Sequence, residues 1–339
     1  MSFQEVQLKP IVESIKLLDI SDEEYFSSKY KDYISNSRLK LINPDQGGSP
    51  QLYKQGLSSA YSDSLYFGSA VHEMVLQPDD FAVVDTVNRP TAKMGFVADY
   101  LYPTWKERVL KNKDFTDASD TIGWYKGKMN QEKVELIVTS CESYWQQKSK
   151  FEDNIEFDKT PIYLDPKSRD KLYTCLASVE ANNDIQSLLH PSGILETPIS
   201  RNEATLLMEV EASVDGKTVV LPLKAKLDNF TADLETNTLT LNDLKTTGHW
   251  LTDFKTDSFV KYHYARQMAM YLWMLKLYAE NGLQMENPNM FANMLVVCTC
   301  PDYRAGVCKV YDREIKEGFK EFKELLQMVA YYEAYGWDD

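Results

Sequence analysis

The sequence has few cysteines, no long apolar run and no recognisable export signal. Its five cysteines in 339 residues are an odd number, so we expect reduced thiols rather than a disulfide framework. No apolar stretch approaches the roughly 18–20 residues that span a bilayer. The first residues lack a basic segment followed by an apolar one, which is how a signal peptide begins. We therefore expect a cytoplasmic protein that does not enter a membrane.

Basic residues are also fewer than acidic residues. Lys and Arg total 37 against 51 Asp and Glu, which gives a net charge of −14. This balance argues against a general basic coat for nucleic acid, although a local basic groove inside an acidic shell is compatible with it. It also suits a site rich in metal-binding carboxylates. The hydrophobic share of 43% is ordinary for a globular protein and excludes a disordered tail or a fibre.

The length fits about two domains of ordinary size, or one large α/β domain with an insertion. We expect a single domain over 1–339. Within it we distinguish an N-terminal helical part (1–90), a helical insertion (91–190), a sheet core (191–300) and a C-terminal helix (301–339). No internal repeat or low-complexity tract interrupts this order.

Hydrophobic periodicity predicts the secondary structure. Helical spacing of apolar residues covers 9–18, 65–77, 259–281 and 314–335, and most of 91–189. Alternation of apolar and polar residues predicts strands at 206–214 and 219–227, which the turn pair Asp215-Gly216 joins into a hairpin. Further strands are expected at 238–246 and 294–300. The pattern therefore predicts an α/β fold.

The second and third of these strands carry charged residues at positions that can meet. On the second strand the apolar residues are at odd positions, so Lys224, Lys226 and Asp228 share the other face. Asp243 and Lys245 share a face of the third strand. Two carboxylates held close together favour a divalent cation such as Mg²⁺ or Mn²⁺, and a lysine beside it can orient an attacking water. Taken singly, each residue also fits an ordinary surface ion pair or a turn.

A polar stripe follows on the next predicted helix. Tyr264, Gln267 and Tyr271 are spaced to lie on one face of it. A buried glutamine needs hydrogen-bond partners. The stripe therefore either points into a cleft beside Asp243 and Lys245, or belongs to a core face that tolerates one polar residue at its edge.

Several short segments occur in one order along the chain: 67–72 (FGSAVH), 226–228 (KLD), 243–247 (DLKTT), Gln267 and Tyr271. This ordered set resembles the PD-(D/E)xK nuclease superfamily. Within it, the chain is most similar to phage-type exonucleases related to exodeoxyribonuclease VIII, with lambda exonuclease as a more distant relative. The segments 34–40 and 76–81 and the pair Ser49-Pro50 fit the same pattern. The resemblance implies a restriction-endonuclease-like α/β core, with a mixed central sheet flanked by helices and a helical insertion, in a single nuclease domain.

The resemblance also implies a metal site. Asp228 and Asp243 would be carboxylate ligands of Mg²⁺, for which Mn²⁺ can substitute, and two ions are expected. The carbonyl group of Leu244 would add a ligand, and His72 matches the family's helix histidine near the second metal position. A further acid is expected on the first strand, where Glu209 and Glu211 both lie on the polar face and the sequence does not choose between them.

Further roles follow from the same resemblance. Lys245 would be the catalytic lysine that positions the hydrolytic water, supported by Gln267 and Tyr271. A pocket for a 5′ phosphate and further DNA contacts are expected from Ser35, Ser37, Arg38, Lys226 and Tyr264. Some relatives carry an iron–sulfur cluster near the position of Cys298, Cys300 and Cys308. Such clusters need four thiolates, and the C-x-C-x7-C spacing here lacks a nearby fourth, so no iron–sulfur cluster is expected.

The implied function is a metal-dependent exonuclease that hydrolyses phosphodiester bonds from duplex DNA ends, 5′ to 3′, in phage recombination or repair in the host cytoplasm. It would leave single-stranded tails for a single-strand annealing protein, and relatives form homo-oligomeric rings around DNA. One alternative is a nuclease of the same fold that acts on single-stranded ends or nicks. The other is a non-catalytic DNA-binding or virion-associated protein. The presence of Asp228, Asp243 and Lys245 argues against a scaffold, which would not need them.

Overall fold

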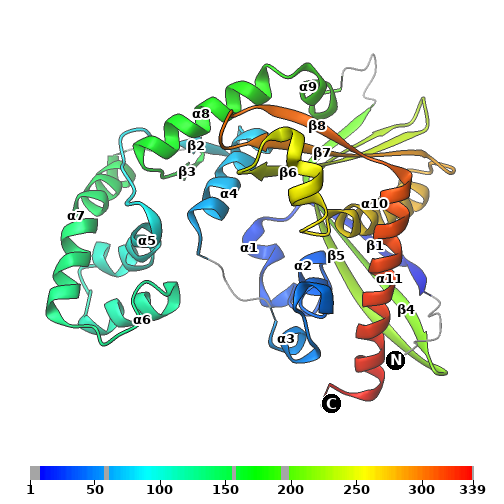
Figure 1. The fold of residues 1–339 in the computed structure, drawn as a ribbon, viewed down its shortest axis with the longest axis horizontal. Helices are drawn as coiled ribbons and strands as arrows, with labels where there is room; N and C mark the ends of the chain where they lie inside the picture. The colour runs from blue at the N-terminus through cyan, green and yellow to red at the C-terminus, as the bar shows by residue number, and fades with distance from the viewer. Residues whose placement is uncertain (1–7, 57–60, 155–157, 192–197, 338–339) are drawn as a thin grey trace. The chain divides into compact units, whose positions relative to one another are not determined.

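The computed structural model describes residues 8–56, 61–154, 158–191 and 198–337. The chain forms two compact units (Figure 1). The sheet unit comprises residues 1–58 and 179–339, and the helical unit comprises residues 59–178. No helix in the described ranges combines the length and the apolar character that a bilayer crossing requires.

The sheet unit is built on a mixed sheet whose described strands follow the order β1-β4-β5-β6-β7-β8. Neighbouring strands are antiparallel except β6 and β7, which are parallel. The strands are β1 (Leu8–Leu18), β4 (Ile199–Val214), β5 (Lys217–Asp233), β6 (Thr238–Thr247), β7 (Asn289–Cys298) and β8 (Ala305–Val310). A mixed α/β architecture, as expected from the sequence, is therefore confirmed.

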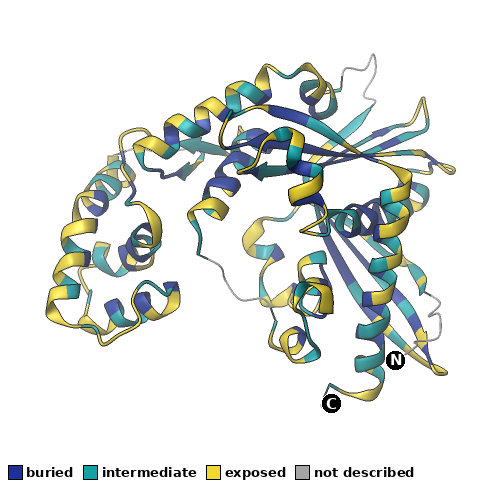
Figure 2. Ribbon diagram, in the orientation of Figure 1, coloured by how far each residue is buried: buried dark blue, intermediate teal, exposed yellow. Residues whose placement is uncertain are grey.

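Strands β4 and β5 form a long hairpin because their apolar residues alternate and a two-residue turn joins them. Asp215 and Gly216 have φ angles of 47° and 79°, which the tight hairpin turn requires. Val210 and Leu221 lie opposite each other on the two strands and are buried in the same core. Figure 2 shows buried residues along these strands and exposed residues at the turn.

Two long helices, α10 (Tyr264–Gly282) and α11 (Asp312–Tyr335), pack against one face of the sheet in a shared hydrophobic core. Helix α10 links the parallel strands β6 and β7, a connection that needs a crossover of this length. The two helices approach closely at Gly318, where a Cβ atom would collide with the carbonyl group of Ala265. Only glycine fits there, so this residue sets the position of the first turn of α10.

Short elements complete the sheet unit. They are α1 (Asp22–Tyr25), η1 (Ser28–Tyr30), α2 (Asn36–Lys40), η2 (Pro44–Gln46), α3 (Pro50–Gln55), α9 (Asn183–Leu189), η3 (Leu251–Asp253) and η4 (Phe254–Phe259). Ile34 fixes the N-terminal elements to the sheet: its amide donates to the carbonyl of Pro222 at 2.8 Å, and its carbonyl accepts from the amide of Lys224 at 3.0 Å. The segment that begins α2 therefore lies beside β5.

The helical unit has a core of its own. Its elements are α4 (Asp63–Leu76), β2 (Phe81–Val83), α5 (Ala92–Lys106), α6 (Asn112–Ile122), α7 (Gln131–Asn154), β3 (Thr160–Ile162) and most of α8 (Pro166–Glu180). Trp145 of α7 is fully buried, and its indole nitrogen donates to the carbonyl of Ala98 at 2.9 Å. The helical character predicted for most of 91–189 and the helix over 65–77 are thus present.

The helix predicted over 9–18 is wrong, because this segment is strand β1, antiparallel to β4. Ile11 and Ile15 fit helical spacing, but β4 offers a row of backbone groups that need partners, and this tertiary demand outweighs the local pattern. The register shifts between Ile11 and Lys16, which explains why β1 lacks simple alternation. Strand β8 is also absent from the sequence-based expectations.

Candidate functional site

Strands β5 and β6 separate where each carries an aspartate. Their pairing ends at Asn229 opposite Asn242. Asp228 and Asp243 are the next residues on the two strands, and the same register would place them opposite each other. Beyond this point the ladder between β5 and β6 stops, while β5 continues to pair with β4, and β6 with β7. The two carboxylates therefore stand at a fork between the strands.

A third carboxylate stands on β4. The pairs on either side, Asn202 with Asn229 and Ala204 with Leu227, place Glu203 opposite Asp228. Glu203 has a φ angle of 52°, in the left-handed region that costs energy for residues other than glycine and that is frequent at functional sites. Glu203, Asp228 and Asp243 thus follow one another across three neighbouring strands. We call these three residues the carboxylate row.

The additional acidic ligand expected from the sequence is Glu209 or Glu211, not Glu203. Those residues lie on β4 opposite Pro222 and Val220. At about 3.3 Å per residue, they are roughly 20 and 26 Å along the strand from Glu203. Glu211 instead forms a surface ion pair with Lys9 at 3.5 Å. The structure therefore does not bring either residue to the carboxylate row.

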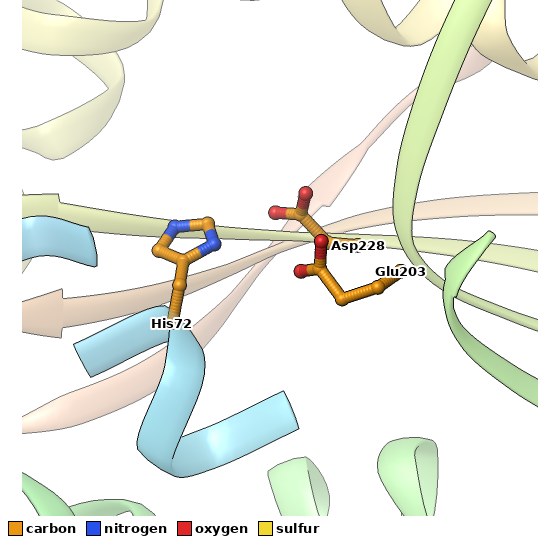
Figure 3. Close-up of side chains that lie close together, drawn as sticks. All are labelled: His72, Glu203 and Asp228. Carbon is orange, nitrogen blue, oxygen red and sulfur yellow. The ribbon is translucent and has the colours of Figure 1, made fainter. Parts of the chain in front are cut away.

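The carboxylates of Glu203 and Asp228 lie side by side (Figure 3). An oxygen of one lies within 4.8 Å of an oxygen of the other. Burial, followed by the charge of Asp228, raises the pKa of Glu203 from 4.5 to about 7. Burial also raises the pKa of Asp228, although the charge of Lys245 and the amide of Leu244 act in the opposite direction. Two acids that are costly to ionise therefore lie together here, and a bound cation would stabilise their charged forms.

Lys245 lies between two members of the row. Its Nζ is 2.5 Å from Oδ2 of Asp243 and 4.0 Å from Oδ2 of Asp228. Burial opposes its charge, but the two aspartates outweigh burial and raise the pKa of Lys245 above its ordinary value. The two aspartates therefore favour the protonated lysine, which can orient a water molecule or stabilise negative charge. Its Nζ also lies 3.4 Å from the carbonyl oxygen of Leu244, the expected backbone ligand.

Helix α10 supplies the polar stripe predicted from the sequence. Nε2 of Gln267 donates to Oδ1 of Asp243 at 2.7 Å. Tyr271 is buried and hydrogen-bonds to Gln267, and burial raises the pKa of its phenol. The ring centroid of Tyr264 lies 5.5 Å from Nζ of Lys245. Of the two readings of this stripe, the structure favours the one in which it faces Asp243 and Lys245.

Lys226 lies on β5, two residues from Asp228. Its ammonium is 2.7 Å from Oε2 of Glu203 and also pairs with Asp22 of α1. Burial lowers the pKa of Lys226, but these carboxylates outweigh burial and raise it. Lys226 thus partly neutralises the carboxylate row and connects it to α1. Within the described chain its observed partners are carboxylates; its expected DNA contact stays a prediction.

Four asparagines form a second row beside the carboxylates. Nδ2 of Asn293 donates to Oδ1 of Asn242 at 3.0 Å, Asn242 donates to Asn229 at 2.7 Å, and Asn229 donates to Asn202 at 2.8 Å. Asn229 and Asn242 are completely buried. This asparagine ladder ties β4, β5, β6 and β7 together one residue away from the fork. It holds the strands in register where the carboxylates would otherwise push them apart.

The residues expected to bind a 5′ phosphate make local contacts. Oγ of Ser35 caps α2 by accepting from the amide of Arg38 at 3.2 Å. Arg38 donates from Nη1 to the carbonyl of Lys31 at 2.7 Å and stacks 4.7 Å from the ring centroid of Tyr53. Ser37 is exposed. The capping role of Ser35 is the ordinary use of serine at this position.

Two other predicted features lie outside the row. His72, also labelled in Figure 3, is on α4 of the helical unit, so its part in a metal site stays a prediction from the sequence motif. Near the end of β7, the thiol of Cys298 donates to the carbonyl of His249 at 2.9 Å. Cys300 is exposed, and Cys308 is half-buried on β8.

The donor set of the carboxylate row fits a hard divalent cation. Such ions take carboxylate oxygens at about 2.0–2.6 Å, so oxygens within 4.8 Å of each other can share one ion. Asp243 adds a carboxylate held in place by Gln267, as ligands are held by a second layer of hydrogen bonds. The raised pKa values of Glu203 and Asp228 point the same way, because a cation would relieve the cost of their charge.

Comparison with known proteins gives little further information. No family model and no curated protein matches the chain. Among solved structures, a candidate exonuclease from Eubacterium rectale has 12% identity and a TM-score of 0.41, over 92% of this chain and 85% of that one. Scheffersomyces stipitis Rai1, in complex with (3′-NADP)⁺ and calcium ion, has 12% identity and a TM-score of 0.28, over 98% and 84%. Similarities of this size carry no functional argument, so function is inferred from the residues of the site.

Proposed function

We propose that this protein is a metal-dependent deoxyribonuclease whose active site is the carboxylate row together with Lys245. The observation that carries the proposal is the convergence of three carboxylates and one protonated lysine at the fork between β5 and β6. The order of the sequence motifs, which resembles the PD-(D/E)xK nucleases, supports it independently. Neither a surface ion pair nor a core position needs this arrangement.

The chemistry follows from the needs of phosphodiester hydrolysis. Glu203, Asp228 and Asp243 would hold Mg²⁺ or Mn²⁺, which would neutralise phosphate charge and activate water. Lys245 would orient the attacking water and stabilise the negative charge of the transition state. Gln267 would keep Asp243 in its orientation, since its amide donates to Oδ1. We further propose, from the motif alone, that the carbonyl of Leu244 and the imidazole of His72 complete the ligand set for a second ion.

The finer proposal is an exonuclease that degrades duplex ends in the 5′ to 3′ direction during phage recombination or repair. Its support is the family resemblance and one feature of Arg38. Nε of Arg38 is buried and has no hydrogen-bond partner within the described parts of the chain, so an anion such as a 5′ phosphate would satisfy it. DNA as substrate, an annealing protein as partner and a homo-oligomeric ring belong to this proposal as consequences of the resemblance.

End-labelled DNA tests the proposal. Linear duplexes with and without a 5′ phosphate, a single strand and a nicked circle are incubated with Mg²⁺ and wild-type protein or Asp243→Ala. We expect nucleotide release from the 5′-phosphorylated duplex, and none with Asp243→Ala. Preference for the single strand or the nicked circle would favour the alternative nuclease. DNA binding without cleavage in either Mg²⁺ or Mn²⁺ would refute the enzyme and favour a binding protein.

A further inference from the structure

A cluster of aromatic side chains extends from the candidate active site to the surface of the sheet unit. Its members are Phe254, Phe259, Tyr262 and Tyr264, and we call it the aromatic cluster. The ring of Tyr264 is at its centre. That ring stacks on Phe254 with centroids 6.0 Å apart and contacts Tyr262 at 5.7 Å. Phe259 lies 6.4 Å from Tyr264.

One side of the cluster contacts the residue proposed to orient the attacking water. The ring centroid of Tyr264 is 5.5 Å from Nζ of Lys245, which pairs with Asp243 at 2.5 Å. A molecule bound on the ring of Tyr262 would therefore be connected to Lys245 through the ring of Tyr264. This continuity distinguishes the cluster from an apolar patch elsewhere on the surface.

The other side of the cluster is open to solvent. Tyr262 is 46% exposed, and its neighbour Val260 is 68% exposed. Nζ of Lys261 lies 5.4 Å from the ring of Tyr262 and is itself exposed. An exposed aromatic ring with a cation beside it suits a ligand that has both a flat face and a negative charge.

The backbone under Tyr262 is held firmly. His263 has a φ angle of 55° and is the N-cap residue of α10. Its Nδ1 is 2.8 Å from Oε1 of Glu321 on α11, and Arg266 is 2.8 Å from the same oxygen. These contacts connect the start of α10, next to Tyr262, to α11. Proteins that bind single-stranded nucleic acid combine such aromatic rings with positive charge along the backbone of the strand.

We propose that Tyr262, backed by Tyr264, is a stacking platform for an unpaired base of the DNA strand being cut, with Lys261 beside the adjoining phosphate. This proposal rests on the proposed nuclease function and specifies its substrate: a strand end that is single-stranded, or frayed from its complement, at the moment of cleavage. Stacking accepts any base, so the platform would favour unpaired ends without reading sequence.

DNA binding is measured in a variant that is not expected to cleave, so that binding is separated from cleavage. In the Asp243→Asn background with Mg²⁺, fluorescence anisotropy follows a labelled dT12 strand and the same strand with abasic sites at its two 5′-terminal positions. Tyr262→Ala should weaken dT12 binding by about 5- to 150-fold, the effect of losing one stacked base. Tyr262→Phe should bind as Tyr262 does. Phe291→Ala, which removes a 57% exposed ring from β7, is the matched control and should change nothing.

The abasic strand separates stacking from a general effect. If a base stacks on Tyr262, removing the two terminal bases weakens binding to the protein that keeps Tyr262. The same removal should hardly change binding to the Tyr262→Ala protein. Equal losses in both proteins, or unchanged dT12 binding by Tyr262→Ala, would overturn the platform. If wild-type protein cleaves DNA but base removal weakens binding equally with and without Tyr262, the nuclease proposal stands and the platform is wrong. If base removal weakens binding only when Tyr262 is present, but wild-type protein shows no metal-dependent cleavage, the nuclease is refuted and the platform stands.

Discussion

Nε2 of Gln267 donates a hydrogen bond to Oδ1 of Asp243 at 2.7 Å, which joins helix α10 to strand β6 at the carboxylate row. The opposite oxygen of Asp243 pairs with Lys245. Asp243 is almost completely buried, so both of its oxygens depend on these neighbours for orientation. The two contacts fix the direction from which this carboxylate can approach a cation.

Replacing Gln267 tests this orientation directly. We expect Gln267→Ala to lower metal affinity or turnover by about 10- to 100-fold, the usual cost of removing a hydrogen bond to a metal ligand. The fold should survive, because the rest of α10 packs in the core through apolar residues. Mn²⁺ titration followed by calorimetry measures the effect. Lys276→Ala on the same helix is the control, and an equal loss there would show a general effect of altering α10.

Glu203→Gln should make the metal-free protein more stable at pH 8, by about 1–3 kcal/mol. The pKa of Glu203 is raised from 4.5 to about 7, so folding above pH 7 forces an unfavourable ionisation that glutamine avoids. The cost is fully present above the folded pKa and disappears as pH falls toward 4.5. Urea unfolding at pH 8 and pH 4.5 measures the difference. A variant that is less stable than wild type at pH 8 would contradict the environment assigned to Glu203.

Divalent cations should stabilise the wild-type protein. Binding to the folded state alone adds about 2.7 kcal/mol when the ion is at 100 times its dissociation constant. Thermal unfolding in EDTA and in Mn²⁺ would measure this shift. Asp228→Asn should lose most of it, while being no less stable than wild type in EDTA, because it removes a buried charge. A cation shift of wild-type size in Asp228→Asn would remove this residue from the site.

The asparagine ladder should position the carboxylates as well as stabilise the sheet. Asn229→Ala removes the short hydrogen bond from the amide of Asn242 and leaves that amide a 3.5 Å contact with the carbonyl of Leu188, which costs about 1–3 kcal/mol of folding free energy. We also expect weaker Mn²⁺ binding at a temperature well below unfolding, a change that lost stability alone would not cause. Ser213→Ala, at an exposed pair near the hairpin turn, is the control. Unchanged metal affinity in folded Asn229→Ala would limit the ladder to a structural role.

Much of this site can be predicted from alternation. Apolar residues at odd positions of β5 fix the face of Asp228, and helical spacing groups Tyr264, Gln267 and Tyr271. The apolar alternation that predicts β4 starts at Leu206, after Glu203, so it does not assign Glu203 to a face of the strand. The sequence does contain a signal for Glu203. Glu203 and Asp228 are equally distant from the Asp215-Gly216 turn, so extending the register of the hairpin away from the turn places them opposite each other.

Other features depend on tertiary contacts that no local pattern encodes. Strand β1 forms because β4 presents unpaired backbone, although Ile11 and Ile15 fit a helix. The asparagine ladder needs residues from four strands, and Asn293 joins only because β7 lies parallel to β6. A short polar residue within a strand gives no sign in the sequence of what lies opposite it.

The most direct test of the central claim is Mg²⁺-dependent release of nucleotides from uniformly labelled linear DNA, with wild type, Asp243→Asn and Lys245→Ala compared at equal folded concentration. The account predicts release by wild type, abolition by EDTA, no release by Asp243→Asn, and a loss of about 100- to 1,000-fold in Lys245→Ala, the usual cost of one transition-state donor. Release by Asp243→Asn at the wild-type rate would contradict it.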